Sequence, residues 1–278
     1  MKRLSLVLLI VVFVFLTACS KQNSNNQMEH GSNGMDHGSH AEKGSTSAAQ
    51  STSAVWTLST ENPKPNTDTA ITIQIQDNEG KPIDKFDINH EKKMHLIVVS
   101  KDLSFFDHIH PEYTGDGKFV VTTQFPDSGD YKLFADYVPT GSSATSQSEW
   151  VSVNGTASEL TEIIPETNFV KTINDINITL SFDHLMAEKD LNLTFNMVDA
   201  KTKKPITDLQ PYLGAVGHVV IISADAEQYL HVHPTDEKAK GPDAQFMTKF
   251  PKSGLYKIWG QFQRNGKTFI VPFVVNVP

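Results

Sequence analysis

Cysteine is almost absent from the sequence, in which Cys19 is the only one among 278 residues. A single thiol cannot form a disulfide within its own chain, so no covalent cross-link is expected to support the fold. Sites built from several thiolates are excluded for the same reason. Any bound metal ion would have to be held by histidine, methionine or carboxylate side chains.

Positive charge is scarce as well. The chain has 24 lysines and arginines against 32 aspartates and glutamates, which gives a formal net charge of −8. No basic patch and no stripe of basic residues interleaved with aromatics occurs along the sequence. Nucleic acid is therefore not expected as a partner.

Long hydrophobic runs are rare, and the run from Leu4 to Leu16 is too short to span a bilayer comfortably. Lys2 and Arg3 precede it, an arrangement typical of an export signal. Residues 1–19 are therefore predicted to be a signal peptide.

The stretch Leu16-Thr17-Ala18-Cys19 resembles the lipobox of bacterial lipoproteins. The resemblance implies that Cys19 carries the lipid, palmitate included, and becomes the first residue of the mature chain. The protein would then lie outside the cytoplasm, anchored to a bacterial membrane, with no thiol left free. An uncleaved anchor or a plain secretory signal are the alternatives.

Residues 20–54 have almost no apolar periodicity and are predicted to form a disordered tether. Soft thioethers and imidazoles occur together in it, at Met28, His30, Met35, His37 and His40. This mixture suits Cu(I) as well as Cu(II), so the tether is a candidate secondary metal site. The alternative is a polar linker without a metal.

The rest of the chain contains an internal repeat. "ITIQIQDNEGKPI", "MHLIVVSKDLSFFDHIHP" and "FPDSGDYKLF" are matched in the same order by "LTFNMVDAKTKKPI", "GHVVIISADAEQYLHVHP" and "FPKSGLYKIW". Duplication of one structural unit follows. We predict domains at residues 55–154 and 167–278, joined by a linker at residues 155–166.

Each unit consists of short β-branched and aromatic runs separated by Gly, Pro, Asp and Asn, which predicts antiparallel strands with tight turns. The sequence around Tyr131, and again around Tyr256, resembles the tyrosine corner of immunoglobulin-like domains. The predicted fold is all-β, with two tandem immunoglobulin-like β-sandwiches.

Both units carry the pattern H-x12-H-x-H-P. Its members are His95, His108 and His110 in the first unit and His218, His231 and His233 in the second. If each pattern folds as a hairpin, paired residue numbers sum to 205 in the first unit and 451 in the second. His95 then faces His110 and His218 faces His233, while the middle histidine shares their face.

Three converging imidazoles are good ligands for Cu(II), Zn(II) or Ni(II), and affinity generally peaks at Cu(II). The pattern therefore predicts one three-histidine metal site in each domain. Glu112 has no counterpart in the second unit and is not assigned as a ligand. Met94 is predicted to lie in the core, and His90 and His184, which have no counterparts either, are predicted on the surface.

At "PITDLQPYLGAVGHVVIIS…YLHVHP" and "MHLIVVSKDLSFFDHIHPE" the two units resemble the YtkA-like extracytoplasmic domains of bacteria. The resemblance implies immunoglobulin-like or cupredoxin-like sandwiches associated with copper and other heavy metals. It brings no established reaction. In style, though not in motif, the chain is also similar to CopC-like copper carriers.

These patterns favour a copper-binding lipoprotein for metal homeostasis, delivery or resistance, with a metal transporter or a cuproenzyme as partner. A structural or adhesive immunoglobulin-like module without metal is the alternative. A metalloenzyme is less favoured. Cupins follow H-x-H with a glutamate, which only Glu237 matches, and superoxide dismutase needs later histidines that are absent after His233.

Overall fold

The computed structural model describes residues 51–156 and 159–278. Every regular element in these ranges is a β-strand, and the part from Thr46 onward forms one compact unit. None of the described segments forms a helix long and apolar enough to cross a membrane. The predicted signal peptide, the lipid site at Cys19, and Met28, His30, Met35, His37 and His40 lie outside the described residues.

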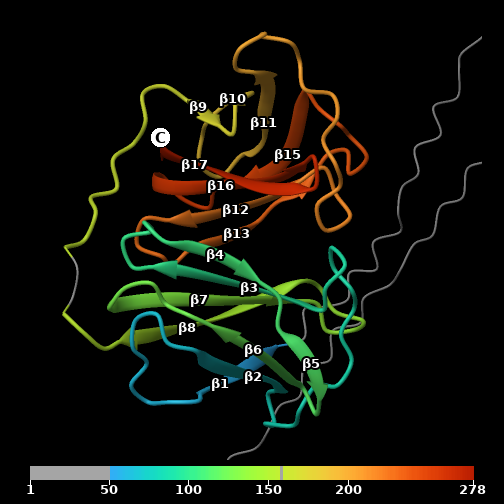
Figure 1. Ribbon diagram of the computed structural model, residues 1–278. Helices are drawn as coiled ribbons and strands as arrows, with labels where there is room; N and C mark the ends of the chain where they lie inside the picture. Colours follow the sequence, from blue (N-terminus) through green and yellow to red (C-terminus); the bar gives the residue numbers. More distant parts are fainter. Residues whose placement is uncertain (1–50, 157–158) are drawn as a thin grey trace, which may run out of the picture. The chain divides into compact units, whose positions relative to one another are not determined.

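The first half of the described chain is a sandwich of two antiparallel sheets (Figure 1). One sheet has the order β1 (Thr52–Leu58), β2 (Thr69–Asp77), β6 (Lys118–Thr123), β5 (Glu112–Gly115). The other has the order β4 (Phe106–Ile109), β3 (Met94–Ser100), β7 (Gly129–Tyr137), β8 (Thr145–Val153). β1 begins before the predicted domain start at residue 55, because its alternate residues already pack against the core.

The second half repeats this architecture. One sheet has the order β14 (His233–Pro234), β15 (Asp243–Lys249), β11 (Asp190–Asp199), β10 (Ile176–Phe182), β9 (Val170–Ile173). The other has the order β13 (Tyr229–His231), β12 (His218–Ser223), β16 (Gly254–Arg264), β17 (Lys267–Val277). The predicted fold class, two repeated antiparallel β-sandwiches, is confirmed.

Strands β3 and β12 are buried on both faces. Every residue of β3 from Met94 to Val99 is buried, although a strand with one wet face would alternate. One face packs inside its own sandwich, and the other contributes to an apolar layer shared by the two sandwiches. In that layer Phe106 stacks on Trp259 with ring centroids 4.7 Å apart, and Phe134 stacks on Tyr229 at 5.3 Å.

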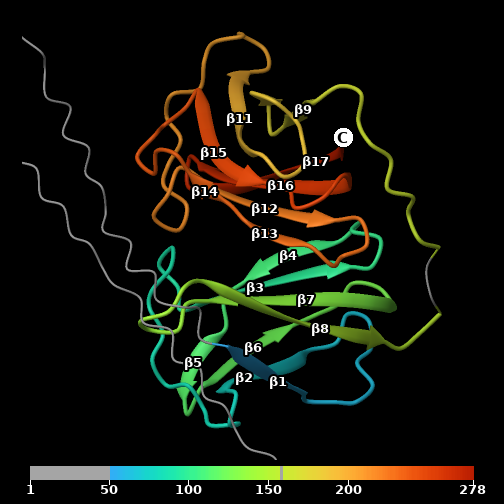
Figure 2. The ribbon, with the colours of Figure 1, turned by 180° about the vertical axis from the view of Figure 1, so that it is seen from behind.

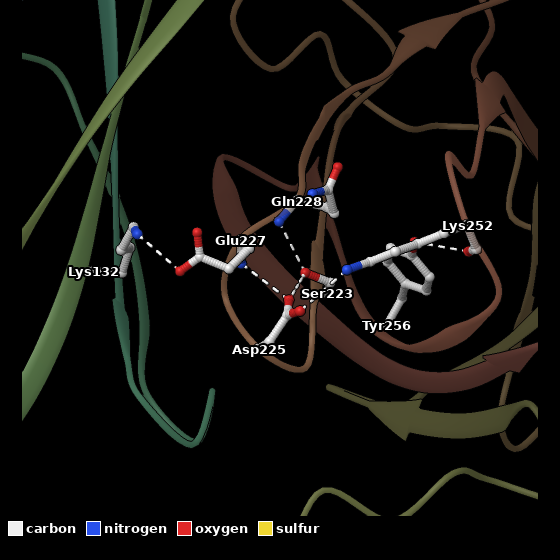
Figure 3. A network of polar contacts seen from close by, with 7 residues as sticks. All are labelled: Lys132, Ser223, Asp225, Glu227, Gln228, Lys252 and Tyr256. Atoms are coloured by element: carbon white, nitrogen blue, oxygen red, sulfur yellow. Dashed lines mark hydrogen bonds and ion pairs between the residues drawn. The ribbon is translucent and has the colours of Figure 1, made fainter.

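Two similar turns set the register of the histidine hairpins. In the first, the Ser100 hydroxyl donates to Asp102 at 2.6 Å and accepts from the Phe105 amide at 2.9 Å. In the second, the Ser223 hydroxyl donates to Asp225 and accepts from the Gln228 amide (Figure 3). Each turn closes a six-residue loop, so equivalent residues of the two hairpins are paired across their strands.

The predicted register is found in both hairpins. Leu96 lies opposite Ile109 and Ile97 opposite His108, so the numbers sum to 205. In the second hairpin Val220 lies opposite His231, so the numbers sum to 451.

The pairing stops before the last predicted pair in each hairpin. Val232 is buried in the second core, and there the chain crosses to the other sheet, where His233 pairs with Met247 (Figure 2). The expected pairing of His218 with His233 is therefore wrong. His110 likewise lies just beyond the end of β4, where the chain crosses toward β5.

Both predicted tyrosine corners are present. The Tyr131 hydroxyl donates to the Asp127 carbonyl at 3.0 Å, and the Tyr256 hydroxyl donates to the Lys252 carbonyl at 2.9 Å. Lys252 also pairs with Asp225, so this corner supports the second turn (Figure 3). Glu227 of the same turn reaches the buried Lys132 of the first sandwich at 3.2 Å.

Asp102→Ala should lower the free energy of unfolding by about 2 kcal/mol, because the carboxylate accepts hydrogen bonds from two serine hydroxyls and two backbone amides. Urea unfolding would measure this. Asp190→Ala, at an exposed strand position, is the matched control and should change little. Equal effects from the two variants would contradict the assigned role of the turn.

Candidate metal centre

Three histidines of the first sandwich converge. The ring centroids of His95, His108 and His110 lie 5.1, 5.0 and 4.8 Å apart. One ligand atom from each can be chosen so that all lie within 4.8 Å of one another. These residues, here called the triad, are the ones that the first H-x12-H-x-H-P pattern predicts.

The strands explain this convergence. His95 lies on β3 and is 5% exposed, and His108 lies on the neighbouring strand β4. His110 follows two residues later, where the chain leaves the sheet, so its ring returns to the same side. The hairpin register thus places all three rings together even though His110 makes no ladder pair.

Hydrogen bonds define the tautomers of two triad members. His95 Nε2 lies 2.9 Å from the Asn89 carbonyl oxygen, which can only accept, so Nε2 carries the proton. His95 Nδ1 is then a lone pair, and His108 Nε2 donates to it at 2.9 Å. A metal ion at this point would take the place of the shared proton.

Gln261, from β16 of the second sandwich, lies behind His108. Its amide nitrogen and oxygen are 3.0 and 3.2 Å from His108 Nδ1, and the residue is 1% exposed. An amide can donate to a bare Nδ1 or accept from a protonated one. Gln261 can therefore support His108 both without a metal and as a ligand through Nε2, the orienting role that partners of metal-bound imidazoles have.

Two other ring nitrogens are buried without a hydrogen-bond partner, His110 Nε2 and His218 Nε2. Such an atom costs roughly 1–3 kcal/mol when it is left unsatisfied. In the tautomer that leaves such a nitrogen without a proton, it is a suitable ligand atom. His110 offers the third donor of the triad, and His218 offers a donor from the second sandwich.

A histidine of the second sandwich lies beside the triad. The ring of His218 lies 5.8 Å from that of His95 and 5.9 Å from that of His108. Packing of the two sheets brings both histidine strands to the same layer, and a separate site at His218, His231 and His233 stays a prediction. The side chain of His231 lies outside the described part of the structure.

His90 belongs to this cluster, and its predicted surface position is wrong. Its ring is half-buried and lies 4.5 Å from that of His218 and 6.4 Å from that of His95. The second repeat has no equivalent histidine, so the repeat pattern gives no signal for it. We call His90, His218 and the triad together the histidine cluster.

The other sequence assignments agree with the structure where it describes them. Met94 is fully buried in the first core, as predicted. His184 is exposed and pairs with Asp183 at 3.0 Å, as predicted for a surface residue. Glu112 is exposed on β5 and takes no part in the cluster.

A buried carboxylate lies beside the cluster. Asp136, on β7, is 3% exposed and is the cross-strand partner of His95, so the two side chains share a face. The Tyr229 hydroxyl, from the second sandwich, donates to it at 2.9 Å. Burial and the Asp136 carboxylate raise the pKa of Tyr229 well above its usual value, so the phenol stays protonated.

His90, His95, His108 and His218 of the cluster line a cavity of about 20 Å³. Its wall is formed by His90, His95, His108, Asp136, His218, Val219, Val220, Tyr229 and Val232. Space of this size fits about one water molecule or a single ion.

Burial keeps the imidazoles of His108, His110 and His218 neutral. It lowers the pKa of His110 to about 4, with contributions from His95 and Lys92, and that of His218 to about 3, with contributions from His90 and His95. Burial and then the neighbouring His95 and His110 place the pKa of His108 well below its usual value. Neutral imidazole is the form that binds a metal.

The spacing of the triad suits a tetrahedral ion. Imidazoles bound at about 2 Å to one such ion have ring centres about 5 Å apart, which is the separation observed. The triad would leave a fourth position for His218 or another donor. The residues present therefore fit a transition metal by donor type, protonation state and spacing.

Comparison with known families gives one match. The family described as "Domain of unknown function (DUF8832)" matches residues 49–155 and 171–278, once for each sandwich. None of the curated proteins matches the sequence.

Solved structures with similar folds include bacterial adhesins. FdeC of Escherichia coli is 18% identical with a TM-score of 0.28, and the match covers 84% of this chain and 65% of FdeC. InvE of Yersinia pseudotuberculosis is 11% identical with a TM-score of 0.24, covering 81% of this chain and 60% of InvE. The chain spans less than two thirds of each, and likenesses this distant carry no argument about function.

Acid should destabilise the metal-free protein through its buried histidines. Their unfolded pKa lies near 6.5, whereas the folded values are about 4 for His110 and about 3 for His218. Between these limits the unfolded chain binds more protons, so the free energy of unfolding falls as pH falls from about 6.5 toward 3. Urea unfolding across this range would measure it.

His218→Gln should make this pH dependence shallower, because one group with a lowered pKa is removed. His184→Gln, which changes an exposed histidine, should retain the wild-type slope. If the free energy of unfolding depended on pH in the same way in the wild type, His218→Gln and His184→Gln, the buried imidazoles would not control acid stability.

Proposed function

The chain belongs to the DUF8832 family, of which it carries two copies, and we propose that it binds one transition-metal ion in its histidine cluster. The triad of the first sandwich supplies the ligands, and the second sandwich supplies Gln261 behind His108 and a further imidazole at His218. Copper is the proposed ion, with Zn(II) or Ni(II) as the other candidates.

The observation that carries this proposal is the convergence of the three triad imidazoles, whose ligand atoms all lie within 4.8 Å of one another. His95 Nδ1 is a lone pair because its Nε2 proton is used by the Asn89 carbonyl. His110 Nε2 is buried and has no hydrogen-bond partner. A binding site needs donors that are deprotonated, oriented and close, and the triad meets all three conditions.

The charge of the site supports a divalent ion. Neutral imidazoles do not offset the positive charge of a bound ion. The Asp136 carboxylate, which lies in the cavity wall, would offset part of that charge. Histidine suits Cu(II), Zn(II) and Ni(II), and affinity at a given site generally peaks at Cu(II).

The wider role is part of the same proposal. We propose a lipid-anchored protein outside the cytoplasm, held by Cys19, whose tether captures copper through Met28, His30, Met35, His37 and His40. The ion would pass to the cluster and from there to a metal transporter or a cuproenzyme. Homeostasis, delivery and resistance are all served by such a carrier.

A structural or adhesive module is the second candidate. It is favoured by the hydrogen bonds that His95 and His108 make to each other, to Asn89 and to Gln261, because these would satisfy packed imidazoles without an ion. In that case the histidines would stabilise the contact between the sandwiches and bind no metal.

Titration of the compact unit from residue 46 with Cu(II) and Zn(II) should give one tight ion per chain. His108→Gln should lower the affinity at least about tenfold, because ligands and their supports each contribute that much or more. Isothermal titration calorimetry and Cu(II) spectra would measure it.

His184→Gln is the matched control, since His184 is exposed and outside the cluster. It should bind like the wild type. No binding above background, with His108→Gln changing only the unfolding free energy, would refute the metal site and favour the structural module.

A further inference from the structure

A thioether lies beside the outermost described histidine of the second pattern. Met247, on β15, is the cross-strand partner of His233, and both residues are exposed, Met247 by 55%. The adjacent bond from the Thr235 amide to the Gln245 carbonyl, at 2.9 Å, continues this register. Directly opposed residues have Cβ atoms roughly 5 Å apart on one face, so the sulfur and the imidazole can reach one ion.

Met247 is unusual for its place on the strand. β15 alternates strictly, with Ala244, Phe246 and Thr248 buried and the residues between them exposed. Methionine contributes less at an exposed strand position than in the core, because it buries less apolar area there. Its flexible thioether is, however, a ligand for soft ions.

His90 connects this exposed pair with the cavity. Its ring lies 6.2 Å from that of His233, and His90 also forms part of the cavity wall with His95 and His108. Two imidazoles bound to one ion on opposite sides have ring centres about 6 Å apart. A single ion could therefore lie between His90 and His233 with only small movements.

The backbone holds His90 at this point under strain. Asn89 and Lys92 exchange two backbone hydrogen bonds, so His90 and Glu91 are the central residues of a two-residue turn. Both have positive φ, 46° and 66°, the form that such turns otherwise build from Asn and Gly. Strained non-glycine positions persist where the surroundings hold them and cluster at functional sites.

We propose that His90, His233 and Met247 form an outer, sulfur-containing site that takes Cu(I) and passes it, still as Cu(I), to the histidine cluster. One thioether and two imidazoles favour a soft monovalent ion, whereas the inner triad has nitrogen donors alone. His90 contacts both sites and is the ligand that the ion keeps during transfer. This inference rests on the proposed function, since the inner cluster is the destination of the ion.

Ag(I), a redox-silent probe of Cu(I) sites, tests the outer site directly. The compact unit from residue 46 removes the tether methionines, and methyl-labelled methionine gives one NMR signal per residue. On adding one equivalent of Ag(I), the Met247 methyl signal should shift, and Met247→Leu should weaken Ag(I) binding about tenfold or more. His233→Gln should weaken it as well.

Met186→Leu is the matched control, because Met186 is also an exposed methionine, 47% exposed, and belongs to neither proposed site. Its signal should not move, and its loss should leave Ag(I) affinity unchanged. An unshifted Met247 signal, or equal affinities for the Met247→Leu and Met186→Leu proteins, would overturn the outer site.

Equilibrium binding of Cu(II) separates this result from the proposed function. Met247→Leu should retain the one tight Cu(II) ion of the wild type, because the inner ligands are untouched. A wild-type protein that binds Cu(II) normally but shows no shift of the Met247 signal with Ag(I) would reject only the outer site. Absence of Cu(II) binding in the wild type would reject the proposed function and, with it, the transfer step.

Discussion

Packing of the sheet β4-β3-β7-β8 against the sheet β13-β12-β16-β17 is the constraint on which the rest of the structure depends. It buries β3 and β12 on both faces and forms an apolar layer from Ile97, Phe134, Val220 and Trp259 among others. Each such side chain contributes on the order of 2 kcal/mol when it leaves water. The two sandwiches therefore share this layer as well as having a core of their own.

Several polar groups in or beside this layer pair across it. Lys132 of the first sandwich meets Glu227, Asp136 accepts from Tyr229, and the Lys257 ammonium donates to the Leu103 carbonyl at 2.7 Å. Buried polar groups without partners would oppose the packing. The cluster follows the same rule, since His108 meets Gln261 across the layer, and metal coordination would use the ring nitrogens that remain. Because ligands and support come from both sandwiches, an ion bound there would stabilise their contact as well as each fold.

The register of the histidine hairpins could be predicted because it depends on local chemistry. Ser100 and Asp102 close one turn and Ser223 and Asp225 close the other, both through hydrogen bonds within six residues. The tyrosine corners could be predicted for the same reason, since each joins residues four apart in the sequence. Where the hairpin ends is not local: Val232 enters the core of the second sandwich, and this moves His233 to the other sheet.

The sequence by itself determined the all-β class, the duplication, the hairpin register and the triad, because alternation, turn residues and repeat spacing act over a few residues. Only the tertiary structure decided that the histidines of both halves meet in one cluster, that His90 joins it from a turn and that Gln261 supports it. The spacing of these residues in the sequence shows no pattern. They come together because the apolar faces of the two sandwiches pack against each other, which requires each sandwich to have folded. The same packing sets the low pKa values of His110 and His218, since burial is a property of the assembled layers.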